Sequence, residues 1–399
     1  MRCFISVRER KKGEEVKKLP GLAILLAAVL LLGTSSAQGG SQNAEDWVQE
    51  YPTVIARAKV LEVSAYEEIK DDWFFTGRQK VTVKIMTGRF QGYIEEIENN
   101  FTGVSYRDLP LKEGDQVLLL LELDGGRLHS VSLYEFGRDR YLYILIGVFI
   151  FAVILIARTK GLKAVLSLII AGLIISQGML PLMLRGHNPM ALTLLFSALI
   201  SIVTLIIFGG FNAKTAAAIV GTFCGVLGAG LIALIFGKAA RLTGFNEDVQ
   251  MLYSSGLPAS LDIRGLLFAG IILGALGAVM DLSQSIASST YAIREANPLL
   301  TVKGLYKAGL ETGRERLARM INLLMLACAG CALPLLLLFA ARDMSYLNVI
   351  NLDMIATEAV RSMAGSFGLL AAAPASAAAA SLLACKFAKA RKSGKGMEL

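Results

Sequence analysis

Seven long apolar runs constrain this chain more than any other feature of its sequence. A helix needs roughly 20 mostly apolar residues to cross about 30 Å of hydrocarbon. Only 18% of the residues are charged, against about 25% in an average soluble protein. We therefore predict an α-helical polytopic membrane protein whose core over 141–385 has about seven transmembrane helices. The apolar runs lie near residues 141–157, 163–184, 190–209, 214–237, 264–286, 317–340 and 357–385.

The N-terminal segment 1–37 combines a basic start with a short apolar stretch from Leu19 to Leu32. The small residues Ser35-Ser36-Ala37 follow this stretch and resemble a cleavage site. The pattern is typical of a signal peptide, and it also fits an uncleaved anchor helix. Both alternatives export the segment that comes next.

The segment 44–136 has the composition of an ordinary soluble domain. Three stretches show partial alternation with β-branched residues, at 54–63, 79–85 and 116–123. Alternation of this kind favours strands, and glycine-containing turn sequences lie between them. We predict a small exported β-rich domain of five or six strands, OB-like in size.

The basic residues give an orientation. If the Lys/Arg-rich start lies in the cytoplasm, most later Lys and Arg residues also fall in cytoplasmic loops. The positive-inside rule predicts such a bias. We expect a multi-pass protein of the bacterial cell membrane, with the β domain outside and the basic tail 386–399 in the cytoplasm. The membrane orientation accounts for most of the excess of basic residues behind the net charge of +8. We therefore expect no nucleic-acid partner.

Asp281 is the most informative polar residue of the apolar runs. Ser285 and Ser288 follow it one and two turns later on nearly the same helix face. A carboxylate at membrane depth costs roughly 2.5–3.5 kcal/mol, so it should face protein or water. This polar stripe could bind an ion, relay a proton or hold a substrate. In the alternative, Asp281 lies near the inner end of its helix and pairs with Arg294 or Arg314.

Small residues predict where helices pack closely. Gly221 and Gly225 lie on one apolar run, and Gly270 and Gly274 lie on the next. Glycines four apart allow two helix backbones to approach each other in lipid. We expect these two helices to pack together. Asn322, in the following run, could hydrogen-bond across helices, and we add it to the tentative substrate or ion pathway.

Enzyme motifs are missing from the sequence. The two histidines, His129 and His187, lie in different segments, so a histidine-rich metal site is excluded. Cys328 and Cys331 form a CxxC pattern inside an apolar run, where packing explains them better than redox chemistry. We expect no enzymatic activity, no cofactor and no metal.

The run Gly274-Ala-Leu-Gly-Ala-Val-Met-Asp281-Leu-Ser-Gln-Ser-Ile-Ala-Ser288 resembles the signature of the YibE/F-like family of bacterial membrane proteins. A later stretch with Gly309, Gly313-Arg314, Asn322, Gly330 and Leu333-Pro334 is similar to that family as well. The sequence departs from the family pattern with Glu315, where the family tends to have Asp, and with Leu323, where it tends to have Thr. The resemblance implies a membrane protein or permease and leaves the substrate open.

Two functions are compatible with this sequence. The first is a membrane transporter or permease for an ion or small solute. The alternative is a non-transporting accessory or sensory membrane protein whose exported β domain binds a ligand or partner. The expected partners are the lipid bilayer, a small solute or ion, and a second copy or another membrane protein.

Overall fold

The computed structural model describes residues 52–69, 75–103, 108, 110–245, 249–251, 262–342 and 344–394, with side chains as far as 386. The expected signal peptide or anchor in 1–37 lies outside the described residues. The chain divides into two compact units, of which one ends at Ile156 and the other begins at Ala157. Each unit is described by itself below.

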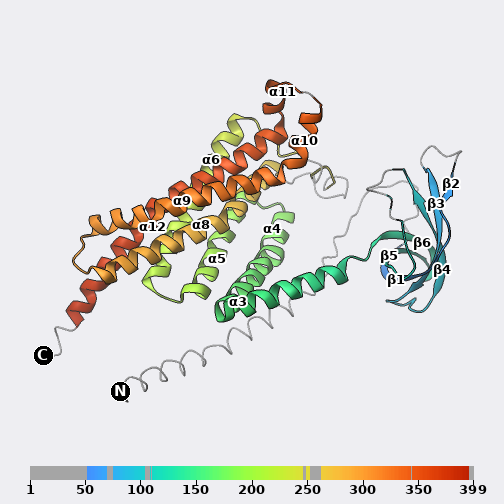
Figure 1. Ribbon diagram of the computed structural model, residues 1–399, viewed down its shortest axis with the longest axis horizontal. Coiled ribbons are helices and arrows are strands. Elements are labelled where there is room, and N and C mark those ends of the chain that lie inside the picture. The colour runs from blue at the N-terminus through green and yellow to red at the C-terminus, as the bar shows by residue number, and fades with distance from the viewer. Residues whose placement is uncertain are drawn as a thin grey trace, which may run out of the picture. The chain divides into compact units, whose positions relative to one another are not determined.

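The first unit contains a six-stranded antiparallel sheet that curves into a half-barrel (Figure 1). Its strand order is β2-β3-β1-β5-β6, and β4 pairs with the other side of β3. The expected strands near 54–63, 79–85 and 116–123 correspond to β1, β3 and β5. The strands are β1 (Thr53–Val63), β2 (Glu67–Glu68), β3 (Gly77–Ile85), β4 (Ile94–Phe101), β5 (Gln116–Asp124) and β6 (Arg127–Phe136).

Alternation along the strands forms the core of this sheet. Val81, Val83 and Ile85 of β3 are fully buried, and Leu119 and Leu121 of β5 are buried beside them. Successive strand residues point to opposite faces, so one face of the sheet is apolar and the other carries charged residues. β4 and β6 are edge strands of the curved sheet, and each pairs with only one neighbouring strand among the described residues.

The sheet continues directly into helix α3 (Asp139–Leu173). Arg57 of β1 forms a 2.7 Å ion pair with Asp139 at the start of the helix. The backbone of α3 leaves helical geometry at Arg158, with φ 50° and ψ −127°. A positive φ is strained for a residue with a Cβ and is incompatible with an α-helix, so α3 is broken at this residue.

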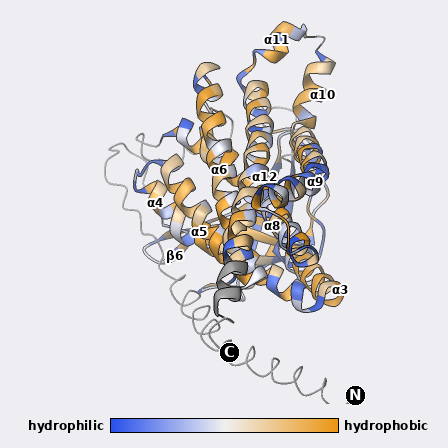
Figure 2. Ribbon diagram, turned by 90° about the vertical axis from the view of Figure 1, so that its left-hand side faces the viewer, coloured by the Kyte–Doolittle hydropathy of each residue, from blue (hydrophilic) through white to orange (hydrophobic). Residues whose placement is uncertain are grey.

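The second unit is helical. After the break in α3, a π-helical turn at Ile174–Met179 leads into α4 (Leu180–Leu184). The longer helices that follow are α5 (Pro189–Gly209), α6 (Ala213–Ala239), α8 (Ile263–Ala296), α9 (Val302–Cys331) and α12 (Asp353–Gly394), with the short α10 (Leu333–Ala341) and α11 (Tyr346–Ile350) between the last two. Figure 2 shows hydrophobic residues along α4, α5 and α6, and hydrophilic residues on α9.

The structure supports a membrane protein with five candidate spans, or six if the bent pair α9–α10 is one span. We expected about seven. The difference arises because runs 141–157 and 163–184 form one 46-residue helical stretch, interrupted only at Arg158. The connection between the next two long helices is short, because α8 extends to Ala296 and α9 already begins at Val302. Thr301 caps α9, since its side chain accepts a hydrogen bond from the Gly304 N–H.

Helix α8 lies at the centre of the helical unit and packs against α5, α6, α9 and α12. Its buried residues include Ile272, Val279 and Ile286, which form one core with residues of α6 and α12. These residues recur every seven positions, which places them on one side of the helix. The opposite side of α8 carries small and polar residues instead of large apolar ones.

Candidate functional site

The outer face of α8 is a stripe of small and polar residues. Gly270, Gly274, Gly277 and Asp281 are all exposed, and Ser288 is partly exposed. Steps of four and three residues keep a stripe on one face of an α-helix. No described atom lies within 4 Å of the position that a Cβ would take on any of the three glycines. This side of α8 is therefore open among the described residues.

The composition of this face is unlike that of the other candidate spans. Among the described residues, each of the other spans exposes large hydrophobic side chains, such as Leu195 on α5, Phe223 on α6 and Phe367 on α12. α8 exposes none between Ile263 and Ala296. Lipid tails favour large apolar side chains and disfavour a carboxylate by roughly 2.5–3.5 kcal/mol at the centre of a span. The face is suited to water or a polar ligand.

Asp281 lies near the middle of the helical unit in depth. A Cβ on Gly225 would approach Val279 Cγ1 to 2.5 Å, so these residues are at the same height. Gly225 is next to the midpoint of the 27-residue helix α6. Asp281 is two residues beyond Val279, which is about 3 Å along the helix axis. The expectation that Asp281 lies near the inner end of its helix does not agree with this placement.

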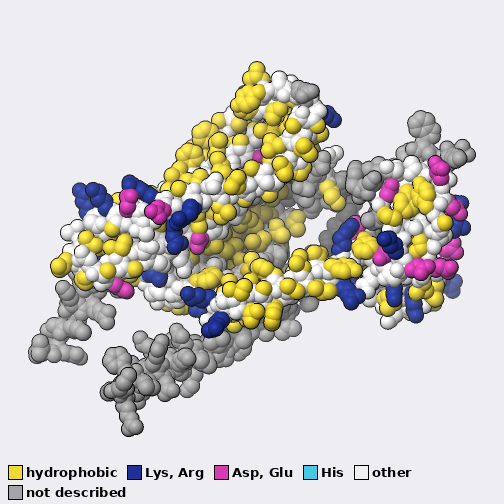
Figure 3. Space-filling view, viewed as in Figure 1, with side chains coloured by type: hydrophobic (Ala, Val, Ile, Leu, Met, Phe, Trp, Pro, Cys, Tyr) yellow, Lys and Arg dark blue, Asp and Glu magenta, His cyan; other side chains and the backbone are white. Residues whose placement is uncertain are grey.

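Two arginines of α9 lie at the height of Asp281. α9 runs antiparallel to α8, since Gly313 packs against Ile286 and Leu324 lies near Ala275. Asp281 is between these two levels, opposite the stretch that contains Arg316 and Arg319. Both arginines are exposed, and neither forms an ion pair with another described residue. Figure 3 shows basic and acidic side chains gathered along the part of α9 nearest its start.

The arginines that we considered as partners of Asp281 are bonded elsewhere. Arg294 donates a 2.6 Å hydrogen bond to the Leu300 carbonyl oxygen. Arg314 pairs with Glu311 on the same helix. Asp281 itself makes no ion pair with any described residue. Its carboxylate is open to a ligand or to water.

The other predicted pathway residues are divided between two environments. Ser288 shares the outer face with Asp281, whereas Ser285 is buried, with 8% of its surface exposed. Ser285 is four residues after Asp281, which places it about 40° further around the helix, toward the neighbouring helices. Asn322 is exposed on α9, on the side opposite Gly313, so it does not join Asp281.

The predicted packing glycines are also divided. Gly221 and Gly225 of α6 contact α12, where Ser376, Ala372 and Gly368 lie against them. The two helices pack together, as expected, but Gly270 and Gly274 make no contact with α6, because the residues of α8 that face α6 are Ile272 and Val279. Helix periodicity places the two glycines half a turn away from that contact.

A layer of buried hydroxyl groups lies behind Asp281, inside the bundle. Its four members come from α5, α6, α8 and α12 and are at most 3% exposed: Ser201, Thr222, Ser283 and Ser376. Each lies one turn from a member of a single cluster that includes Leu205, Ala218, Ala287 and Ala380.

These hydroxyl groups differ in their hydrogen bonding. Ser201 and Thr222 donate to carbonyl oxygens one turn earlier in their own helices, at 2.6 and 2.8 Å. The hydroxyl groups of Ser283 and Ser376 have no hydrogen-bond partner among the described residues. A buried hydroxyl without a partner costs about 1–3 kcal/mol.

Sequence reasoning did not identify Arg316, Arg319 or the complete hydroxyl layer as parts of one region. Because α9 already begins at Val302, both arginines lie in the middle of a long helix and not at its start. The three-and-four spacing of the glycines before Asp281 was a usable signal for the open face. The signal was ambiguous, because the same spacing also favours helix packing.

The comparisons with known proteins agree with this architecture. The family model described as YibE/F-like protein matches residues 145–386, and the model of the YibE/F family N-terminal domain matches residues 53–135. The chain belongs to the YibE/F-like family. Comparisons with curated proteins and with solved structures gave no match. In this YibE/F-like protein the N-terminal family region, 53–135, corresponds to the half-barrel. The region 145–386 contains the helical core with Asp281.

Proposed function

We propose that this YibE/F-like protein is a membrane transporter or permease for an ion or small solute, and that the outer face of α8 lines the pathway. The observation that carries the proposal is the composition of that face. It holds three exposed glycines and Asp281 at mid-depth, on a span that exposes no large hydrophobic side chain among its described residues.

Helix α9 also carries charge at the height of Asp281. A charged helix face at membrane depth is stable only next to water or protein, because lipid cannot solvate it. Arg316 and Arg319 bring charge to the height of Asp281. The contacts of α9 with α8 are at Ile286 and Thr290, on the side away from Asp281, so the arginines share the height of Asp281 and not its face.

The proposal includes a topology. A turn of the chain at Arg158 would divide the 46-residue stretch into two crossings, and the bent pair α9–α10 would form another. This gives seven crossings after the half-barrel. The half-barrel then lies outside the cell membrane and the C-terminus inside, as the distribution of Lys and Arg favours.

The test uses the full-length protein in proteoliposomes. Currents on a solid-supported membrane are recorded after exchange into NaCl, KCl, MgCl₂ or sodium phosphate, and uptake of labelled alanine and glucose is measured in parallel. We expect at least one of these solutes to cross, and Asp281→Asn to reduce its flux at least tenfold. The substitution removes the negative charge at mid-depth on the open face.

Glu311→Gln is the matched control, since it also neutralises one exposed carboxylate, on α9 beside Arg314. Its flux should stay within about twofold of the unchanged protein. Equal flux in Asp281→Asn and the unchanged protein would contradict the assigned pathway. No flux of any tested solute above protein-free liposomes would contradict transport of this group of solutes.

A further inference from the structure

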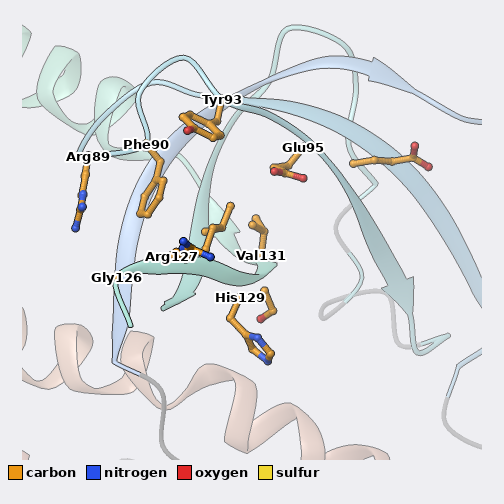
Figure 4. Close-up of a pocket in the computed structure, with 11 residues that line it drawn as sticks. Arg89, Phe90, Tyr93, Glu95, Gly126, Arg127, His129 and Val131 are labelled. Carbon is orange, nitrogen blue, oxygen red and sulfur yellow. The ribbon is translucent and has the colours of Figure 1, made fainter. Parts of the chain in front are cut away.

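The half-barrel contains a second candidate site that is independent of the transport pathway. A cavity of about 630 Å³ opens between the start of β4 and the start of β6. Its walls come from the β3–β4 connection, the start of β4 and the start of β6 (Figure 4). This volume is within the range of roughly 300–1,000 Å³ that is typical of small-molecule sites.

Charges of opposite sign occupy opposite ends of the cavity. Arg89 lies at one end and Glu95 at the other, with Arg127 between them, as Figure 4 shows. Arg89 Nη1 would be 3.3 Å from a Cβ on Gly126, so its guanidinium group lies over the residue that precedes Arg127. None of these three charged residues pairs with another described residue. The neighbouring Glu96 has Lys80 as its partner, at 3.9 Å.

Aromatic and aliphatic side chains form part of the cavity wall between its two ends. The rings of Phe90 and Tyr93 meet edge to face with centroids 5.9 Å apart, and Val131 lies across from them. Aromatic rings in such a position provide a large and rigid contact surface for an apolar group. A ligand for this cavity therefore has an apolar centre between an acidic end and a basic end.

Free strand edges flank the cavity. β4 pairs with β3 alone, and β6 pairs with β5 alone, within the described part of the sheet. The outer edge of each strand has backbone N–H and C=O groups without a ladder partner. An extended peptide can bind such an edge through its own backbone, with side-chain pockets giving selectivity.

The cavity lies at the end of β6 that is farther along the chain from α3. The lining residues of β6 lie at its start, between Arg127 and Val131, while α3 follows its other end at Phe136. Five to nine strand residues separate the two, which is about 17–30 Å.

We propose that this cavity binds a short peptide with free termini. The C-terminal carboxylate lies between Arg89 and Arg127, an apolar side chain contacts Phe90 and Tyr93, and the N-terminal ammonium group faces Glu95. Guanidinium groups bind carboxylates through paired hydrogen bonds, which makes the arginine end selective for the C-terminus.

The experiment titrates the full-length protein in nanodiscs by isothermal calorimetry with the tripeptide Ala-Phe-Ala. Two derivatives are compared with it, one with an acetylated N-terminus and one with an amidated C-terminus. We expect the free tripeptide to bind at least tenfold more tightly than either derivative. Arg89→Gln combined with Arg127→Gln should abolish the preference over the amide, and Glu95→Gln should abolish the preference over the acetylated peptide.

Arg78→Gln and Glu98→Gln are the matched controls, because both residues lie on the same sheet outside the cavity and face each other at 3.8 Å. They should retain both preferences. The proposal is overturned if no tripeptide binds the unchanged protein, if only one terminus affects affinity, or if the cavity variants discriminate as the unchanged protein does.

Discussion

Gly221 of α6 and Ser376 of α12 lie in direct contact at the centre of the helical unit. A Cβ on Gly221 would overlap the Ser376 hydroxyl group, and Ser376 is fully buried. Close approach of two helix backbones over a glycine is a main source of helix association in lipid. The contact explains why α12 and α6 share an extensive interface.

Gly221→Ala should therefore destabilise the protein by about 1–3 kcal/mol, as overpacking of a dense core usually does. The measurement is thermal unfolding of the detergent-solubilised protein, followed by loss of the monodisperse chromatographic peak. Combining Gly221→Ala with Ser376→Gly should restore most of the loss. Gly277→Ala is the matched control, because no described atom lies within 4 Å of its Cβ position. A loss as large in Gly277→Ala would show that packing against Ser376 is not the cause.

The open face of α8 should be accessible to water. Gly277 and Leu227 lie at the same depth, since each is two residues from the contact between Val279 and Gly225. Leu227 is exposed on α6 among other large hydrophobic residues. In a background without the five native cysteines, Gly277→Cys should react with a charged maleimide at least tenfold faster than Leu227→Cys. Equal rates would mean that lipid or another helix covers the face.

The two arginines at the height of Asp281 should affect transport, whereas the paired arginine near them should not. Arg316→Gln and Arg319→Gln each remove a charge at the height of Asp281, and we expect a reduction in flux of roughly tenfold for each. Arg314→Gln removes the charge that pairs with Glu311 and should change flux less than twofold. Uptake into proteoliposomes measures all three variants. Equal losses in all three would indicate a general effect of charge on α9.

The unpartnered hydroxyl group of Ser283 should reduce stability. Ser283→Ala removes a buried polar group without a described partner and should stabilise the protein by about 1 kcal/mol. Thr222→Val removes a hydroxyl group that is already bonded to the Ala218 carbonyl oxygen, and it should not stabilise. Thermal unfolding compares the two variants. A clear loss of stability in Ser283→Ala would mean that its hydroxyl group is hydrogen-bonded.

The junction between the sheet and α3 should show a pH dependence. The pKa of Glu135 is lowered because its carboxylate accepts a hydrogen bond from the Phe136 N–H, and Arg138 lies 2.9 Å away. A lowered pKa in the folded state stabilises the protein above the unfolded-state pKa, and this contribution is lost as the pH falls through the lowered value. Arg138→Gln should raise the pKa of Glu135 toward its ordinary value, as measured by an NMR titration of labelled glutamate. An unchanged pKa would leave the backbone hydrogen bond as its sole cause.

Several features of this protein followed from sequence alone. The apolar runs predicted a membrane protein because their length matches the hydrocarbon thickness. The alternation at 54–63, 79–85 and 116–123 predicted strands where β1, β3 and β5 occur. The isolated carboxylate of Asp281 was recognisable because few ionisable residues occur within apolar spans. Each of these signals depends only on residues that are close together in the sequence, so it can be read without knowing the tertiary structure.

The tertiary structure decided which faces meet. Spacing placed Gly270 and Gly274 on the same face as Asp281, but the contacts of Val279 with α6 were needed to show that this face is open. The height of Arg316 and Arg319 followed from the packing of Gly313 against Ile286. Helix periodicity determines which residues share a side of a helix. It does not determine which neighbour covers that side, because this depends on how residues far apart in the chain fit together in space.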